Sequence, residues 1–202
     1  MKKNTKEFIV KTTLKLFMKY GVENTSMNML AMECGISKPA IYYYFKSKKE
    51  LAKGVLNYFE KEMNNWSRKH HNKNDNAKTF FKKLITSIQL FKDVATMVLL
   101  EKVPEEINYS FNEIMLQISK ISSESKEKSK SIGRMTRHAI GERIKIAQLT
   151  GEIRNDLNPE TIGILIHAII EGMEFIGSLD SDLDLNKISE AIFEDFWKMI
   201  TK

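Results

Sequence analysis

The chain of 202 residues is long enough for one sizeable core or two smaller ones, and its 42% hydrophobic and 29% charged residues exclude a mainly disordered protein. No run of about 18 apolar residues occurs, and the opening MKKNTKEFIVKTTLKLF lacks the apolar centre of a signal peptide, so we expect a soluble protein of the cytoplasm with no membrane partner. The single cysteine, Cys34, excludes an internal disulfide and a cysteine-based metal site.

The net charge of +6 is unevenly spread along the chain. Residues 1–74 carry 15 lysines and arginines against 6 acidic residues, whereas residues 75–202 carry 17 against 20. This asymmetry predicts that the first third contacts a polyanion, either a nucleic acid or an anionic membrane surface, and that the remainder has another role.

The spacing of apolar residues predicts an all-α protein. Apolar residues recur three and four positions apart, glycine and proline are scarce, and strand-like alternation is absent. The first helix is expected over 5–20, and Gly21 is suited to end it. A short helix capped by Thr25 or Ser26 and ended by Gly35 is expected next, with Cys34 packed on its inner side.

A third helix is expected to begin at Ser37, with Pro39 in its first turn. Two short helices about a three-residue turn apart are typical of a helix-turn-helix, whose second helix can enter the major groove of DNA. The sequence SKKE at Ser47–Glu50 predicts the capping box of a fourth helix that runs toward the polar stretch 68–76.

Further helices are expected over 77–92, 105–121, 132–149, 159–177 and 186–200, the last two begun by Asn158-Pro159 and by Asp184. The serine- and lysine-rich segment 122–131 is interpreted as a mobile loop or as the exposed face of a helix end. The 159–177 helix is apolar on more than one face, so it must lie deep in a bundle or pack on a second subunit.

Three consecutive tyrosines mark the third helix. If Ser37 is its cap, Ile41 and Phe45 point into the core and residues 42–44 lie on the outward arc. A tyrosine there can donate its hydroxyl to a phosphate or place its ring against a thymine methyl group. Lys46, Lys48 and Lys49 can supply the phosphate contacts that dominate affinity for DNA.

From Gly21 to Leu51 the chain reads GVENTSMNMLAMECGISKPAIYYYFKSKKEL, which resembles the N-terminal signature of TetR-type (tetracycline-repressor-like) transcriptional regulators. The resemblance implies about nine helices, with a helix-turn-helix DNA-binding domain over 1–50, a connecting helix over 51–74, and a ligand-binding and dimerisation domain over 75–202. It places base contacts at Asn28, Lys38, Pro39, Ala40, Tyr43 and Tyr44, and phosphate contacts at Tyr42 and Lys48, with Ser26 and Met27 near a further one.

The segment GEIRNDLNPE, residues 151–160, is similar to the turn that precedes the two C-terminal dimerisation helices of these regulators. The resemblance therefore implies a homodimer with a four-helix interface built from 159–177 and 186–200. The residues expected in this interface are Ile162, Ile166, Ile169, Ile170, Met173, Ile188, Ile192, Phe196 and Ile200.

Methionine, aromatic and polar side chains of the middle helices form a candidate effector pocket, since methionine suits an adaptable apolar site, although packing in the core is the default interpretation. The candidates are Met63, Trp66, Phe80, Tyr109, Phe111, Met115, Met135, His138, His167, Glu171 and Met173. The i, i+4 pair His167 and Glu171 has the spacing of two metal ligands but lacks a visible third one, so we expect no metal and no cofactor, and an effector of unknown identity.

These observations predict a DNA-binding transcriptional regulator that recognises a palindromic operator and is released by a small-molecule effector. The alternative is an architectural or interaction protein of the same fold without an effector, and activation in place of repression stays open because it depends on where the operator lies. We expect no enzyme, because the chain has no nucleophile elbow, no phosphate-binding glycine loop and no H-E-x-x-H motif.

Overall fold

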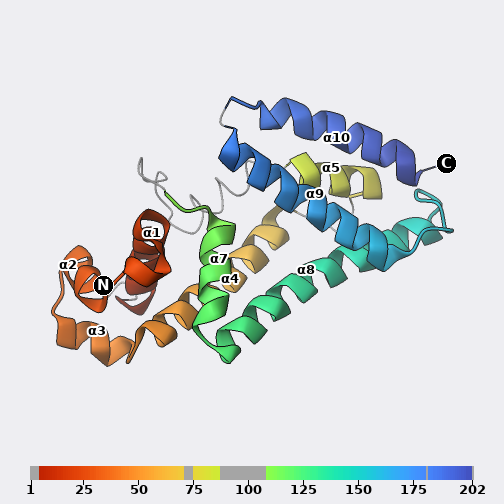
Figure 1. Cartoon of the computed structure of the whole chain (residues 1–202). Coiled ribbons are helices and arrows are strands. Elements are labelled where there is room, and N and C mark those ends of the chain that lie inside the picture. The colour runs from red at the N-terminus through yellow and green to blue at the C-terminus, as the bar shows by residue number, and fades with distance from the viewer. Residues whose placement is uncertain (1–4, 71–74, 87–107, 181, 202) are drawn as a thin grey trace. The chain divides into compact units, whose positions relative to one another are not determined.

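The structure is a computed structural model that describes residues 5–70, 75–86, 108–180 and 182–201. All regular elements in these ranges are α-helices, which confirms the expected all-α fold (Figure 1). The helices are α1 (Thr5–Asn24), α2 (Met27–Cys34), α3 (Lys38–Tyr44), α4 (Lys48–His70), α5 (Ala77–Thr86), α7 (Phe111–Ile121), α8 (Ser123–Leu149), α9 (Pro159–Leu179) and α10 (Leu185–Ile200).

The chain divides into two compact units. Unit 1 contains α1, α2, α3, α4 as far as Trp66, α7, and α8 as far as Ile132. Unit 2 contains the last residues of α4, the rest of α8, and α5, α9 and α10. Because this division passes through α4 and α8, it differs from the predicted boundaries at 50 and 74, and those boundaries stay a prediction.

In unit 1, α1 packs against α2 and α7, and α2 packs against α3. The helix starts follow from the caps that the sequence predicts: the Ser26 hydroxyl accepts a hydrogen bond from the Met29 amide at 3.1 Å, and the Ser37 hydroxyl accepts one from the Ala40 amide at 3.3 Å. The α4 start differs slightly from a regular capping box, because the Glu50 carboxylate accepts from the Lys46 amide at 2.7 Å.

Unit 2 is built around one apolar core. Phe81 of α5, Ile144 of α8, Ile166 of α9 and Phe193 of α10 are fully buried in it. Helix α10 packs against both α5 and α9 (Figure 1). Asn158 and Asp184 cap α9 and α10 through side-chain oxygens, which confirms both predicted starts.

Two expected segments differ from the structure. The sequence allows the stretch 122–131 to be either a mobile loop or the exposed face of a helix end. In the structure it is helical from Ser123 onward and forms the start of α8. The helix expected over 105–121 begins at Phe111, because Ser110 and Glu113 form a reciprocal capping box there. Residues 87–92 and 105–107 of the expected helices lie outside the described residues.

Gly21 interrupts α1 with φ 79° and ψ 161°, a backbone conformation that is nearly restricted to glycine. A Cβ atom at this position would lie 3.0 Å from Cζ of the ring of Tyr109, a residue just before the start of α7. The close approach of this ring to the α1 backbone therefore depends on the missing side chain.

We predict that Gly21→Ala lowers the free energy of unfolding by roughly 1–3 kcal/mol, because it adds backbone strain and displaces the Tyr109 ring. Chemical denaturation followed by circular dichroism measures the loss. The matched control is Gly35→Ala, since Gly35 also has a positive φ of 63° but has nothing within 4 Å of an added Cβ. Equal losses in the two variants would show that the contact with Tyr109 contributes nothing.

Candidate nucleic-acid interface

Helix α3 is anchored by two apolar side chains. Ile41 is fully buried, and Phe45, which ends the helix and donates its amide to the Ile41 carbonyl at 2.9 Å, is 3% exposed. Their four-residue spacing puts both on one side of the helix. The opposite side is left for the tyrosines.

The three tyrosines differ in exposure. Tyr43 is 74% exposed and Tyr42 is 37% exposed, whereas Tyr44 is half-buried. The rings of Tyr43 and Tyr44 meet edge to face with centroids 5.1 Å apart. This contact restrains the Tyr43 ring while most of its surface stays open to a partner.

The other residues assigned to DNA by resemblance lie at the start of α2 and in the first turn of α3. Ser26, Asn28, Lys38 and Pro39 are exposed, and Met27 and Ala40 are half-buried. Cys34, the last residue of α2, is buried, and burial raises the pKa of its thiol despite a hydrogen bond with Thr12. Cys34 therefore packs as a small apolar residue and lies away from the exposed surface.

The lysines that follow α3 have different surroundings. Lys46 is exposed, with its ammonium 6.0 Å from the centre of the Tyr43 ring. Lys49 is exposed and lies 3.8 Å from the Glu124 carboxylate. Lys48 is half-buried and donates from its ammonium to the Glu23 carbonyl at 2.7 Å, and desolvation lowers its pKa although the Glu23 charge acts to raise it.

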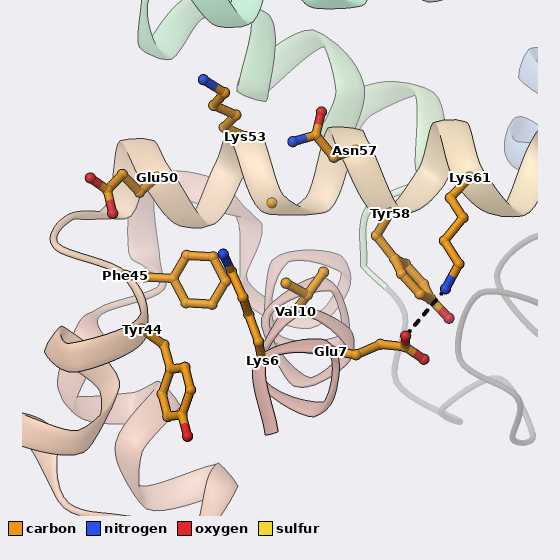
Figure 2. Close-up of a pocket in the computed structure, with 11 residues that line it drawn as sticks. Lys6, Glu7, Val10, Tyr44, Phe45, Glu50, Lys53, Asn57, Tyr58 and Lys61 are labelled. Carbon is orange, nitrogen blue, oxygen red and sulfur yellow. Dashed lines mark hydrogen bonds and ion pairs between the residues drawn. The ribbon is translucent and has the colours of Figure 1, made fainter. Parts of the chain in front are cut away.

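A groove of about 560 Å³ lies behind α3, between α1 and α4 (Figure 2). At one end the Phe45 ring packs so close to Gly54 that a Cβ there would lie 2.9 Å from it, and the Lys6 ammonium lies 5.4 Å from the ring centre. At the other end the carboxylate of Glu7 pairs with Lys61 at 3.3 Å. The Phe45 contacts hold the end of α3 against α1 and α4, and the Glu7–Lys61 pair joins α1 to α4.

The candidate effector residues fall in both units. In unit 1, Met63, Tyr109 and Met115 are half-buried; in unit 2, Phe80 and Met173 are buried, Met135 and His138 are exposed, and His167 and Glu171 are half-buried. The side chains of Trp66 and Phe111 lie outside the described residues. The Phe80 ring is covered by the Arg143 guanidinium at 5.2 Å, and His167 pairs with Glu171 at 3.1 Å.

The predicted dimer residues lie mainly in the core of unit 2. Ile162, Ile166, Ile170, Met173, Phe196 and Ile200 are buried there, and Ile169, Ile188 and Ile192 are half-buried. The buried members pack inside unit 2, and the interface residues stay a prediction. Helix α9 is apolar on more than one face, and its other face carries the exposed Ile164, Leu165, Phe175, Ile176 and Leu179.

Two contacts that sequence reasoning missed join α1 to the chain around α7. The Gln117 side-chain oxygen accepts a hydrogen bond from the Val22 amide at 2.8 Å, and the Asn108 side chain donates to the Lys19 carbonyl at 2.8 Å. No local signal identifies either pair, because the partners are about ninety residues apart. Among the residues that the structure describes, no three His, Cys, Asp or Glu side chains gather as metal ligands, and no helix is long and apolar enough to cross a membrane.

Residues 9–55 match the family model for bacterial regulatory proteins of the tetR family. The chain carries a tetR-family N-terminal domain. The matched range begins in α1 and ends in α4, so the tetR-family domain includes the whole of α3 and the lysines that follow it.

Known proteins resemble both this domain and the whole fold. The chain is 36% identical over 103 residues to YuxN of Bacillus subtilis strain 168, an uncharacterised HTH-type transcriptional regulator, and the match covers 49% of this chain and 35% of YuxN. The match thus includes about a third of that relative's length.

Two solved structures share the fold. A TetR-family transcriptional regulator from Cytophaga hutchinsonii aligns with a TM-score of 0.77 and 18% identity over 98% of this chain and 94% of that one. AibR, in complex with isovaleryl coenzyme A and operator DNA, aligns with a TM-score of 0.72 and 16% identity over 94% and 96%. At these identities the similarity establishes the fold.

We predict that Ser37→Ala destabilises α3 by about 1 kcal/mol, because the Ala40 amide loses its capping partner at the start of a seven-residue helix. Amide hydrogen exchange at residues 41–45 should quicken accordingly. Ser26→Ala, which removes the equivalent cap of α2, is the matched control and should leave these amides protected. If amide exchange at residues 41–45 is unchanged in Ser37→Ala, the burial of Ile41 and Phe45 is enough to hold α3 without the cap.

Proposed function

We propose that this protein is a sequence-specific DNA-binding transcriptional regulator of the cytoplasm, and that it represses from a palindromic operator until a small-molecule effector releases it. We assign it no enzymatic activity. The observation that carries the proposal is α3, which is capped at Ser37, anchored by Ile41 and Phe45, and presents Tyr43 with 74% of its surface exposed. It lies within the tetR-family domain.

The chemistry of this surface suits the major groove. Tyr43 offers an apolar ring edge for a thymine methyl group and a hydroxyl for a base edge or phosphate, and Lys38 and Lys46 are exposed cations at the two ends of α3. Base contacts from the ring would set sequence preference, and the lysines would supply the salt-dependent attraction.

We predict that Tyr43→Ala reduces discrimination between operator and other DNA by roughly 1–3 kcal/mol, whereas Lys46→Ala weakens binding to all sequences and lowers the salt slope by about one. The measurement is a binding titration on fragments of the DNA upstream of the protein's own gene, at two salt concentrations. Tyr20→Ala, an exposed tyrosine of α1 outside the helix-turn-helix, is the control. If Tyr43→Ala and Lys46→Ala both leave operator affinity unchanged, α3 does not contact the DNA.

A homodimer would place two α3 helices on a palindromic operator. The exposed apolar face of α9 supports such a homodimer. Ile164 and Phe175, and likewise Leu165 and Ile176, are eleven residues apart, which is close to three helical turns, so they share a face with Leu179. An added Cβ at Gly172, on the same face, would meet nothing within 4 Å. An apolar face of this length is typical of a subunit interface.

We predict that Ile176→Glu converts the dimer into a monomer, because it would bury an unpaired carboxylate at the interface. Sedimentation velocity at micromolar concentration measures the change, and the helical content by circular dichroism should be retained. The matched control is Leu116→Glu, a similarly exposed apolar position on α7, at 58% against 52%. A dimer that survives Ile176→Glu would place the interface elsewhere.

That a small molecule binds is supported by two proteins of the same fold, AibR in complex with isovaleryl coenzyme A and operator DNA, and SmeT in complex with triclosan; that the effector causes release from DNA is our proposal. In this protein the effector would favour a dimer in which the two α3 helices are wrongly spaced for DNA, and its influence equals its differential affinity for the two states. The alternative, an architectural DNA-binding protein, predicts DNA binding that no small molecule relieves.

A further inference from the structure

The groove between α1 and α4, about 560 Å³ in volume, has an apolar floor. Val10, Phe45 and Tyr58 line it and are buried. At Gly54 the backbone of α4 is bare, and an added Cβ would lie 2.9 Å from the Phe45 ring and 3.2 Å from Val10. An apolar floor with a few polar groups around it, in a groove of this size, is typical of a small-molecule site.

The two acidic side chains that line the groove already have partners. The Glu7 carboxylate pairs with Lys61 at 3.3 Å and with Lys11 at 3.4 Å. Partial burial acts to raise the pKa of Glu7, but these two lysines lower it overall, so the carboxylate stays ionised and paired. The Glu50 carboxylate accepts a hydrogen bond from the Lys46 amide at 2.7 Å. A cationic ligand would therefore have to displace one of these partners.

The basic side chains that line the groove differ from one another. Lys61 and Lys53 are each paired with a glutamate, whereas Lys6 is exposed and has no acidic partner in the described contacts. The Lys6 side chain extends toward the Phe45 ring, and its ammonium lies 5.4 Å from the ring centre (Figure 2). A cation over a ring at an exposed site is held weakly, so Lys6 can exchange this contact for a stronger one with an anion.

These surroundings favour one class of ligand. The rings of Tyr44, Phe45 and Tyr58 line the groove and suit a flat aromatic group, which can stack on a ring or meet it edge to face. One cation without an acidic partner matches a single negative charge, and a carboxylate carries that charge at neutral pH. None of the side chains that the sequence assigns to an effector lines this groove, so a ligand here would be additional to that effector.

We propose that the groove binds a small aromatic carboxylate, with its ring on Phe45 and the bare backbone at Gly54, and with its carboxylate accepting a hydrogen bond from the Lys6 ammonium. Phe45 ends α3, and Tyr44, which also lines the groove, meets the Tyr43 ring edge to face at 5.1 Å. The ligand would thus contact two residues that orient the exposed Tyr43 ring. Only this consequence for DNA recognition rests on the proposed function, and the binding itself does not.

The test is a titration of the isotope-labelled full-length protein, followed through its amide resonances, with phenylacetate, phenylacetamide and acetate as probes. We expect phenylacetate to shift the amides of Phe45 and Gly54 with a dissociation constant in the millimolar range, as is usual for so small a ligand. Phenylacetamide has the same shape but no charge and should bind about threefold more weakly, which is the effect of an exposed charge pair. Acetate, which lacks the ring, should shift neither amide.

Two lysine variants locate the charge that the carboxylate meets. In Lys6→Met the preference for phenylacetate over phenylacetamide should fall from about threefold to about one, because the cation is absent. Lys46→Met is the matched control, since the Lys46 ammonium also lies over a ring, that of Tyr43 at 6.0 Å, but outside the groove. This variant should keep the preference. Because the preference is a ratio measured within one protein, a change in stability does not alter it.

Each of three results would overturn the proposal. The amides of Phe45 and Gly54 could stay unshifted at phenylacetate concentrations well above the millimolar range, or the shifts could be confined to unit 2, where the probe would occupy another site. An equal preference in Lys6→Met and the wild type would show that Lys6 does not hold the carboxylate. The experiment contains no DNA, so its failure leaves the proposed function standing, and a protein that selects no operator can still bind the ligand here.

Discussion

A seven-residue helix is too short to be stable in water by itself, so α3 depends on being anchored. The burial of Ile41 and Phe45 provides this anchor, and Phe45 does so by packing into the space that Gly54 leaves open on α4. Any side chain at Gly54 would push the Phe45 ring and with it the end of α3. The orientation of the exposed tyrosines is thus determined by a contact on the opposite side of the helix.

Charge in unit 1 is also distributed unevenly, with paired lysines on α4 and, among the described contacts, unpaired ones at the ends of α3. Lys53 and Lys49 lie near the Glu124 carboxylate of α8, whose pKa Lys53 lowers, and Lys128 of α8 pairs with Glu60 of α4. Exposed pairs of this kind contribute little to stability, but they neutralise the lysines of α4 locally. Lys38 and Lys46, at the two ends of α3, are exposed and have no acidic partner in the described contacts.

Local chemistry made much of the fold predictable from sequence. The caps at Ser26, Ser37, Asn158 and Asp184 are short-range interactions, so the residue type and its spacing are enough to identify them. The start of α8 was ambiguous because SSESKEKSKS carries few apolar residues, and the contacts that its residues make in the fold, such as Lys128 with Glu60, are not visible in the sequence. Periodicity could not tell which apolar face of α9 points into the core of unit 2, because the helix is apolar on more than one face. The bond between Gln117 and Val22 had no sequence signal because it joins residues 95 positions apart.

The burial of Cys34 has a chemical consequence. Its thiol lies inside the helix-turn-helix with a raised pKa, so the reactive thiolate is scarce at neutral pH and oxidants have little access to it. The only sulfhydryl of the chain is therefore shielded from peroxide and from disulfide exchange between molecules. A signal that acts through cysteine oxidation would therefore find the one thiol of this chain buried.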